Sequence, residues 1–213
     1  MTNASRSPSP ASKRQKTQDE HGESSRPQDH AHKQDKNFTQ KEDGTIDDYP
    51  HLLPYENKDP NFKPKYHAEC HCGAVKYEVS DEPVSSVCCH CTTCQVVHGA
   101  VAQRAVLFKK EMVRFNEDSY DAMAFYQTHD KKTGRHLPCK VRCKNCASYI
   151  ADEGRNMFLA FPSLFKFDDR EDRQEPANWK PTDHIFYGQR SLDFERKDGV
   201  TFWEGAKDKS DKM

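Results

Sequence analysis

The nine cysteines are the residues of this sequence best suited to chemistry, because most of them lie in three short stretches. These are CHCG (70–73), CCHCTTC (88–94) and CKNCA (143–147), with Cys139 four residues before the last. Cysteines at this density form disulfides, bind a metal or act as nucleophiles. Their number is odd and the N-terminus has no apolar signal-peptide core, so we expect an intracellular protein with reduced thiols. The clusters are therefore more typical of metal binding than of disulfides.

The third and first stretches together predict one closed metal site. In a C-x-x-C turn, Cys143 and Cys146 direct two thiolates toward one tetrahedral Zn²⁺ at about 2.3 Å per sulfur. Such a pair supplies half of a site and needs a second pair elsewhere in the chain. Cys70 and Cys72 face the same side of an extended segment, and Gly73 permits a tight turn after them. These four cysteines are the predicted ligands of a structural zinc ion that ties two distant segments together.

The middle stretch offers three thiolates within one turn, those of Cys89, Cys91 and Cys94. Three ligands leave one corner of a tetrahedron open, which distinguishes catalytic from structural zinc sites. A fourth protein ligand would instead close the site, and His98 lies one helical turn after Cys94. The neighbours Cys88 and His90 would need strained geometry to bind the same ion. The spacing alone leaves both alternatives, an open and a closed site.

The composition divides the 213 residues into a polar N-terminal segment and a folded remainder. Hydrophobic residues make up 34% of the chain, against roughly 45–50% in ordinary globular proteins with glycine included. Apart from the initial Met, residues 1–48 contain one Phe and one Ile as large apolar side chains. Such a segment cannot bury enough apolar surface to offset its loss of conformational entropy. We expect residues 1–48 to form a disordered tail and the remainder to form one core.

Charge and hydropathy argue against two classes of partner. The formal net charge is −1, so the overall balance does not favour nucleic acid. No apolar run approaches the roughly 20 residues needed to span a bilayer, and we expect no membrane partner. Within the tail, SKRQK (12–16) resembles a short nuclear-import signal, although such stretches are also ordinary solvated charge clusters. We expect a cytoplasmic protein, with the nucleus as an alternative, and the oligomeric state is not predicted.

Short alternating segments separated by turn residues predict a small antiparallel β domain. The clearest is AVKYEVS (74–80), in which Val75, Tyr77 and Val79 share one face. One short helix is expected at 92–99, beginning near Thr92 and ending at Gly99. The charged C-terminal stretch 203–213 is expected to fray. The other expected strands are 100–108, 112–115, 122–128, 137–143, 156–165 and 184–188.

Four motifs carry a resemblance to a known family. CHCGAVKYEV (70–79), CHCTTCQVVHGA (89–100), RCKNCASYI (142–150) and PTDHIFYGQR (181–190) together resemble the glutathione-dependent formaldehyde-activating enzymes, a family that also includes centromere protein V. The resemblance covers about residues 66–190, which implies a zinc-binding domain there and a C-terminal extension at 191–213. It implies an all-β, β-tent-type fold of stacked antiparallel sheets with zinc knuckles.

The resemblance also implies roles for individual cysteines. Cys89, Cys91 and Cys94 match the three ligands of the family's catalytic zinc, and the four cysteines of the first and third stretches match its structural zinc. The resemblance therefore implies two zinc ions per chain. Cys88 and Cys139 match no ligand position, and we expect both to be small buried side chains. Ala147 stands where the family usually has Gly.

The implied activity is that of a zinc-dependent carbon–sulfur lyase, of the type that forms S-(hydroxymethyl)glutathione from glutathione and formaldehyde. The implied partner is a small thiol such as glutathione. The alternative is a non-catalytic zinc-binding module with a protein- or chromatin-binding role. Candidate general acids are His90, His98 and His184. Candidate cations for an anionic substrate are Arg104, Arg135 and Arg142.

Overall fold

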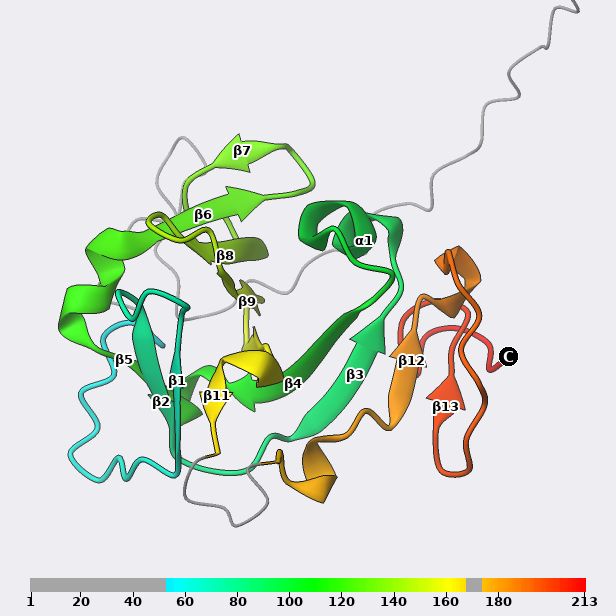
Figure 1. Ribbon diagram of the computed structural model, residues 1–213, viewed down its shortest axis with the longest axis horizontal. Coiled ribbons are helices and arrows are strands. Elements are labelled where there is room, and N and C mark those ends of the chain that lie inside the picture. The colour runs from blue at the N-terminus through cyan, green and yellow to red at the C-terminus, as the bar shows by residue number, and fades with distance from the viewer. Residues whose placement is uncertain (1–52, 168–173) are drawn as a thin grey trace, which may run out of the picture. The chain divides into compact units, whose positions relative to one another are not determined.

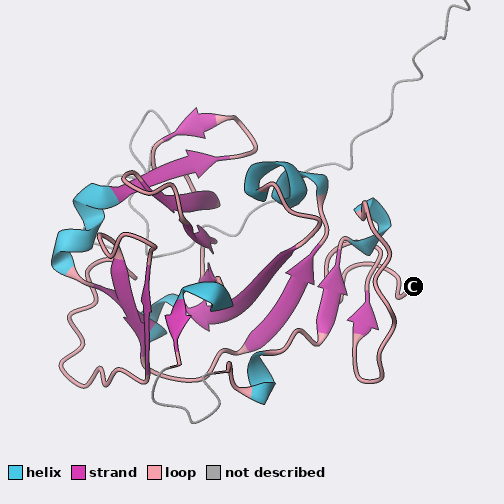
Figure 2. Cartoon of the chain, viewed as in Figure 1, coloured by secondary structure: helices cyan, strands magenta, loops and turns pink. Residues whose placement is uncertain are grey.

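The computed structural model of the protein describes residues 53–167 and 174–213, and strands predominate in it (Figures 1 and 2). The expected tail, 1–48, and its basic stretch lie outside the described residues. The strands form two sheets. The larger has nine strands in the order β13 (Thr201–Phe202), β12 (Asp183–Ile185), β3 (Ser85–Cys89), β4 (Gln103–Lys109), β10 (Met157–Ala160), β9 (Tyr149–Glu153), β8 (Cys139–Cys143), β6 (Met123–Gln127) and β7 (Lys132–Thr133). The smaller has four, in the order β11 (Phe165–Lys166), β1 (Tyr66–Glu69), β2 (Lys76–Val79) and β5 (Val113–Phe115).

Helical structure is confined to short elements between the strands. The α-helix α1 (Thr92–His98) follows β3 and ends at Gly99 in the left-handed conformation, as the sequence predicts. No helix in residues 53–167 and 174–213 is long and apolar enough to cross a membrane. The 3-10 helices are Lys110–Met112, Glu117–Ala122, Pro162–Leu164, Ala177–Trp179 and Tyr187–Gln189.

The core lies between the two sheets and is largely aromatic. Tyr77 of β2 and Phe115 of β5 both pack against Phe158 of β10, with ring centroids 5.6 Å apart in each case. Tyr77 alternates with Val75 and Val79 on the buried face, as the sequence pattern predicts. The predicted all-β class of stacked antiparallel sheets is confirmed, except that β12 pairs in parallel with β3 and β13.

Local backbone chemistry explains where the predicted strand limits are wrong. The predicted strand 156–165 divides into β10 and β11, because Pro162 lacks an N–H for the ladder and starts a 3-10 helix. The chain crosses there from the larger sheet to the smaller one. The predicted strand 184–188 ends at Ile185, because Phe186 adopts a φ of +53° and turns the chain. The sequence analysis does not predict the strands β1, β3, β7, β9 and β13.

The C-terminal stretch is packed, so the expectation that residues 203–213 fray is wrong. Trp203 is buried, and its indole N–H donates to Asp183 at 2.9 Å. The last residue, Met213, donates its backbone N–H to the carbonyl of Phe202 at 2.9 Å. Burial of the large aromatic side chain of Trp203 stabilises this stretch, while its charged neighbours stay largely exposed.

A buried carboxylate forms the charged centre of the core. Glu153 at the end of β9 is fully buried, and its oxygens accept hydrogen bonds from Lys110 at 2.8 Å and the Tyr55 hydroxyl at 2.8 Å. Arg135 donates to both oxygens, at 3.0 and 2.5 Å. Arg135 is therefore held inside the protein, in contrast to the expectation that it could face an anionic substrate.

We expect Glu153→Gln to lower the free energy of unfolding by about 3–5 kcal/mol, because it leaves two buried cations without their countercharge. Urea denaturation followed by circular dichroism measures the change. Glu111→Gln is the matched control, since the side chain of Glu111 is 63% exposed, and it should change stability by less than about 0.5 kcal/mol. Equal effects of the two substitutions would contradict this view of the core.

Candidate metal centres

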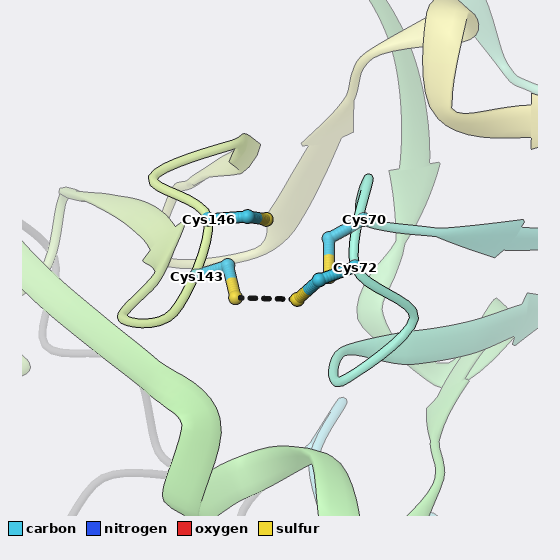
Figure 3. Close-up of side chains that lie close together, drawn as sticks. All are labelled: Cys70, Cys72, Cys143 and Cys146. Carbon is cyan, nitrogen blue, oxygen red and sulfur yellow. Dashed lines mark hydrogen bonds between the residues drawn. The ribbon is translucent and has the colours of Figure 1, made fainter.

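Four sulfur atoms meet where the smaller sheet approaches the larger one. Cys70 and Cys72 lie in the turn between β1 and β2, and Cys143 and Cys146 lie in the turn between β8 and β9; Figure 3 shows the two pairs facing each other. All four sulfurs lie within 4.8 Å of one another. The sulfurs of Cys70 and Cys72 are 3.6 Å apart, and those of Cys72 and Cys143 are 3.8 Å apart. Sulfurs at the corners of a zinc tetrahedron with bonds of 2.3 Å are about 3.8 Å apart, so these residues fit Zn²⁺.

Both turns of this four-sulfur cluster require unusual backbone angles. Gly73 has a φ of +75°, and its N–H donates to the carbonyl of Cys70 at 2.9 Å. Ala147 has a φ of +61°, and its N–H donates to the carbonyl of Cys143 at 3.1 Å. Glycine adopts such angles without strain, whereas alanine does so at a cost. The knuckle thus forms with Ala147 in place of the usual Gly.

Hydrogen bonds from neighbouring polar groups favour the thiolate at two positions of the four-sulfur cluster, whereas hydrogen bonds with the other cysteines raise the pKa of Cys72. The hydroxyl of Ser148 lies 3.2 Å from the sulfur of Cys146 and lowers the pKa of that thiol to about 5. The backbone N–H of Val75 donates to the sulfur of Cys70 at 3.3 Å. Zinc binds the deprotonated form of cysteine, so these contacts favour the state that binds metal.

A second, smaller sulfur cluster lies where β3 runs into α1. Cys89 ends the strand, Cys91 caps the helix and Cys94 lies in its first turn. The three sulfurs lie within 4.8 Å of one another. The backbone N–H of Cys94 donates to the sulfur of Cys91 at 3.3 Å, which is an N-cap made by a thiol. The pKa of Cys91 is lowered to about 2, first because its sulfur accepts a hydrogen bond from Cys89 and then from Cys94.

His98 does not complete this three-sulfur cluster. It belongs to a different group of donors, with Cys94 and Asp152, and shares only Cys94 with the cluster. Within residues 53–167 and 174–213, no further Cys, His, Asp or Glu donor lies within 4.8 Å of all three sulfurs. The two sulfur clusters therefore differ in the number of candidate metal ligands, four in one and three in the other.

A lysine that the sequence did not single out contacts the three-sulfur cluster. Lys140 of β8 donates to the sulfur of Cys94 at 3.4 Å and to the carboxylate of Asp152 at 2.5 Å. Burial lowers the pKa of Lys140, but the negative charges of Asp152 and Cys94 outweigh it and raise the pKa. In the sequence, the alternation of side chains along a strand places Lys140 on the same side as Arg142. No nearby residue in the sequence indicates that α1 covers Lys140, so the sequence did not single it out.

The other two candidate histidines form a separate buried pair. The Nε2 of His90 lies 2.9 Å from the Nδ1 of His184, and together with Cys88 they form a fourth group of donors within 4.8 Å. Burial, then His184 and Arg190, lower the pKa of His90 to about 4. Cys88 is buried, as expected from the sequence.

The remaining predicted residues divide between the interior and the surface. Cys139 is buried beside Glu153, as expected. Arg104 donates to Glu175 at 2.6 Å and to the carbonyl of Trp179 at 2.9 Å. Arg142 is exposed. Of the three candidate cations, Arg142 alone is exposed, because Arg135 and Arg104 are held in ion pairs.

Comparisons with known proteins give one family. The model of the family "Glutathione-dependent formaldehyde-activating enzyme" matches residues 65–189. The chain is also similar to the crystal structure of a Rhodobacter sphaeroides protein, at 19% identity, over 51% of this chain and 95% of that one, with a TM-score of 0.39. A search of curated proteins finds no match.

The left-handed angle of Ala147 generates a prediction about stability. Ala147→Gly should raise the free energy of unfolding by about 0.5–1 kcal/mol, because glycine removes the strain at this angle. Thermal unfolding of the zinc-loaded protein measures the shift. Ala177→Gly is the control: Ala177 is exposed in a 3-10 helix with negative φ, and glycine there should lower stability by about 0.5–1 kcal/mol. Shifts in the same direction would exclude backbone strain at Ala147.

Proposed function

Because the chain belongs to the glutathione-dependent formaldehyde-activating enzyme family, we propose that it is a zinc-dependent carbon–sulfur lyase of the S-(hydroxymethyl)glutathione synthase type. The family associates it with glutathione-dependent formaldehyde activation. The finer assignment, with its substrates, its two zinc ions and its ligands, is our proposal. Residues 66–190 form the zinc-binding domain in this proposal, and 191–213 form an extension of it.

One observation carries the proposal, namely the difference between the two sulfur clusters. Cys70, Cys72, Cys143 and Cys146 supply a full tetrahedron and hold the structural zinc. Cys89, Cys91 and Cys94 supply three corners and leave one position for a substrate sulfur. A site that served only to hold the fold together would not need a free ligand position.

The reaction joins a thiol to formaldehyde. The sulfur of glutathione forms a bond with the carbonyl carbon, the electron pair of the C=O π bond passes to oxygen, and the proton of the thiol ends on that oxygen. A Zn²⁺ ion held by Cys89, Cys91 and Cys94 would supply a borderline-soft Lewis acid able to bind a thiol sulfur and lower its pKa.

The protein's own residues hold and shape this site. Cys89, Cys91 and Cys94 would hold the ion at the junction of β3 and α1, because they lie at a strand end and a helix start. Lys140 donates to Cys94, which offsets part of the negative charge that three thiolates contribute. The activity requires seven reduced thiols and therefore an intracellular compartment.

Substitution of single cysteines tests the division between the clusters. Cys91→Ser should give a folded protein that keeps the metal of the four-sulfur cluster and loses the rate enhancement. Cys143→Ser should instead cost the fold, because structural zinc binding contributes folding free energy. Zinc content, circular dichroism and the rate of adduct formation from ¹³C-formaldehyde, above the uncatalysed rate, measure the three outcomes.

Cys88→Ser is the matched control, since Cys88 adjoins Cys89 but lies outside both clusters. It should retain both metal ions and the activity. If Cys91→Ser and Cys143→Ser unfold alike, the assignment of structural and catalytic roles is wrong. If Cys91→Ser keeps the full rate, the three-sulfur cluster is not catalytic and a non-catalytic zinc module is the better description.

A further inference from the structure

Three polar side chains lie against the three-sulfur cluster, each at most 19% exposed, and we call them the polar triad: His98, Lys140 and Asp152. Lys140 and Asp152 are directly paired across β8 and β9, so they lie on the same face of the sheet. His98 ends α1, one turn after Cys94. The donor atoms of His98 and Asp152 lie within 4.8 Å of the sulfur of Cys94. The triad is thus built from three elements that converge on one ligand of the cluster.

Two atoms of the triad lack hydrogen-bond partners although they are buried. These are the Nε2 of His98 and the Oδ1 of Asp152, which lie 3.8 Å apart. The separation exceeds that of a direct hydrogen bond. The His98 side chain is only 4% exposed. A buried polar atom without a partner is costly, so two of them facing each other beside a metal-binding cluster indicate a place for a polar ligand.

The chemistry of the two atoms specifies the ligand. A carboxylate oxygen only accepts hydrogen bonds, so its partner must donate. A neutral imidazole nitrogen can donate, so its partner must then accept. A hydroxyl group does both, and an oxygen about 2.8 Å from each atom forms a triangle on the 3.8 Å base. A carbonyl oxygen could not satisfy Asp152, because it has no hydrogen to donate.

A second metal ion is the competing ligand, because Cys94, His98 and Asp152 form a group of potential metal donors. Lys140 argues against it. Its ammonium group already contacts two of the three donors, at 3.4 Å from Cys94 and 2.5 Å from Asp152. The Lys140 ammonium in that position would repel a metal ion. It also neutralises the negative charge of Asp152 and Cys94 that would otherwise attract one. The triad therefore fits a neutral hydroxyl better than a metal ion.

We propose that the polar triad binds the hydroxyl group that formaldehyde contributes to the thiol adduct. This inference rests on the proposed function. The adduct carries its hydroxyl one carbon from the sulfur, and the triad lies beside Cys94, next to the position proposed for that sulfur. His98 and Asp152 hold the oxygen through hydrogen bonds. Lys140 is a positioning residue that fixes the carboxylate of Asp152 and contacts Cys94.

The ring of His98 allows a variant that removes both ring nitrogens, including the unpartnered Nε2, and keeps the aromatic packing. His98 packs against Tyr149 and Phe161, with centroids 4.5 and 5.2 Å away. In His98→Phe these contacts remain, whereas the hydrogen bond to the hydroxyl is lost. His98→Gln places an amide N–H near the original Nε2 and should restore part of the function.

The experiment separates binding of the thiol from binding of formaldehyde. Calorimetry measures the Kd of glutathione without formaldehyde, and initial rates at saturating glutathione give kcat/KM for formaldehyde. His98→Phe should leave the Kd of glutathione within about twofold and lower kcat/KM for formaldehyde about tenfold or more, as expected for loss of one hydrogen bond in a charged network. The zinc content should stay at the wild-type value. His67→Phe, on the exposed face of β1, is the control and should change neither quantity.

Three other results would each overturn either the hydroxyl site or the proposed function. An unchanged kcat/KM for formaldehyde in His98→Phe would overturn the hydroxyl site and leave the proposed function intact. Loss of zinc from this variant would make His98 a metal ligand and overturn the hydroxyl site as well. A wild-type protein that neither binds glutathione nor accelerates adduct formation would overturn the proposed function and, with it, this inference.

Discussion

The central constraint on this structure is the close approach of sulfur atoms from distant parts of the chain. Cys70 and Cys72 come from a hairpin of the smaller sheet, and Cys143 and Cys146 come from a hairpin of the larger sheet, yet their sulfurs lie within 4.8 Å. Four thiols so close together repel one another once ionised, and a divalent cation removes that repulsion. A metal at this point would link two sheets whose aromatic core also holds them together. The same turns then determine the register of β1 with β2 and of β8 with β9.

The short segment 88–94 contributes side chains to two separate groups of donors. Along β3 and the residues after it, side chains alternate between the two faces of the sheet. Cys89 and Cys91 belong to the three-sulfur cluster, whereas Cys88 and His90 belong to the buried group with His184. Because α1 begins at once after Cys91, Cys94 returns to the first face and completes the cluster. The strand supplies one ligand, and the helix start supplies the other two.

Local signals in the sequence predict the cysteine clusters, and the rest of the site depends on distant pairing. C-x-C and C-x-x-C spacings limit where thiols can point, so Cys70, Cys72, Cys143 and Cys146 could be grouped from the sequence. Lys140 and Asp152 could not, because their positions follow from the β8–β9 register and from the docking of α1. From sequence alone Arg135 is one of three candidate cations for an anionic substrate, since nothing in sequence links it to Glu153. Similarly, the charged composition of residues 203–213 predicts fraying, whereas the burial of Trp203 orders this stretch.

The central claim is that one cluster offers a complete set of sulfur ligands and the other leaves a place for a substrate sulfur. X-ray absorption at the zinc edge tests it most directly, because it counts sulfur neighbours per ion. The account predicts an average of about 3.5 sulfurs per zinc in the protein alone and about 4 after glutathione is added. An average of 4 before addition, or a value that glutathione does not change, would contradict it.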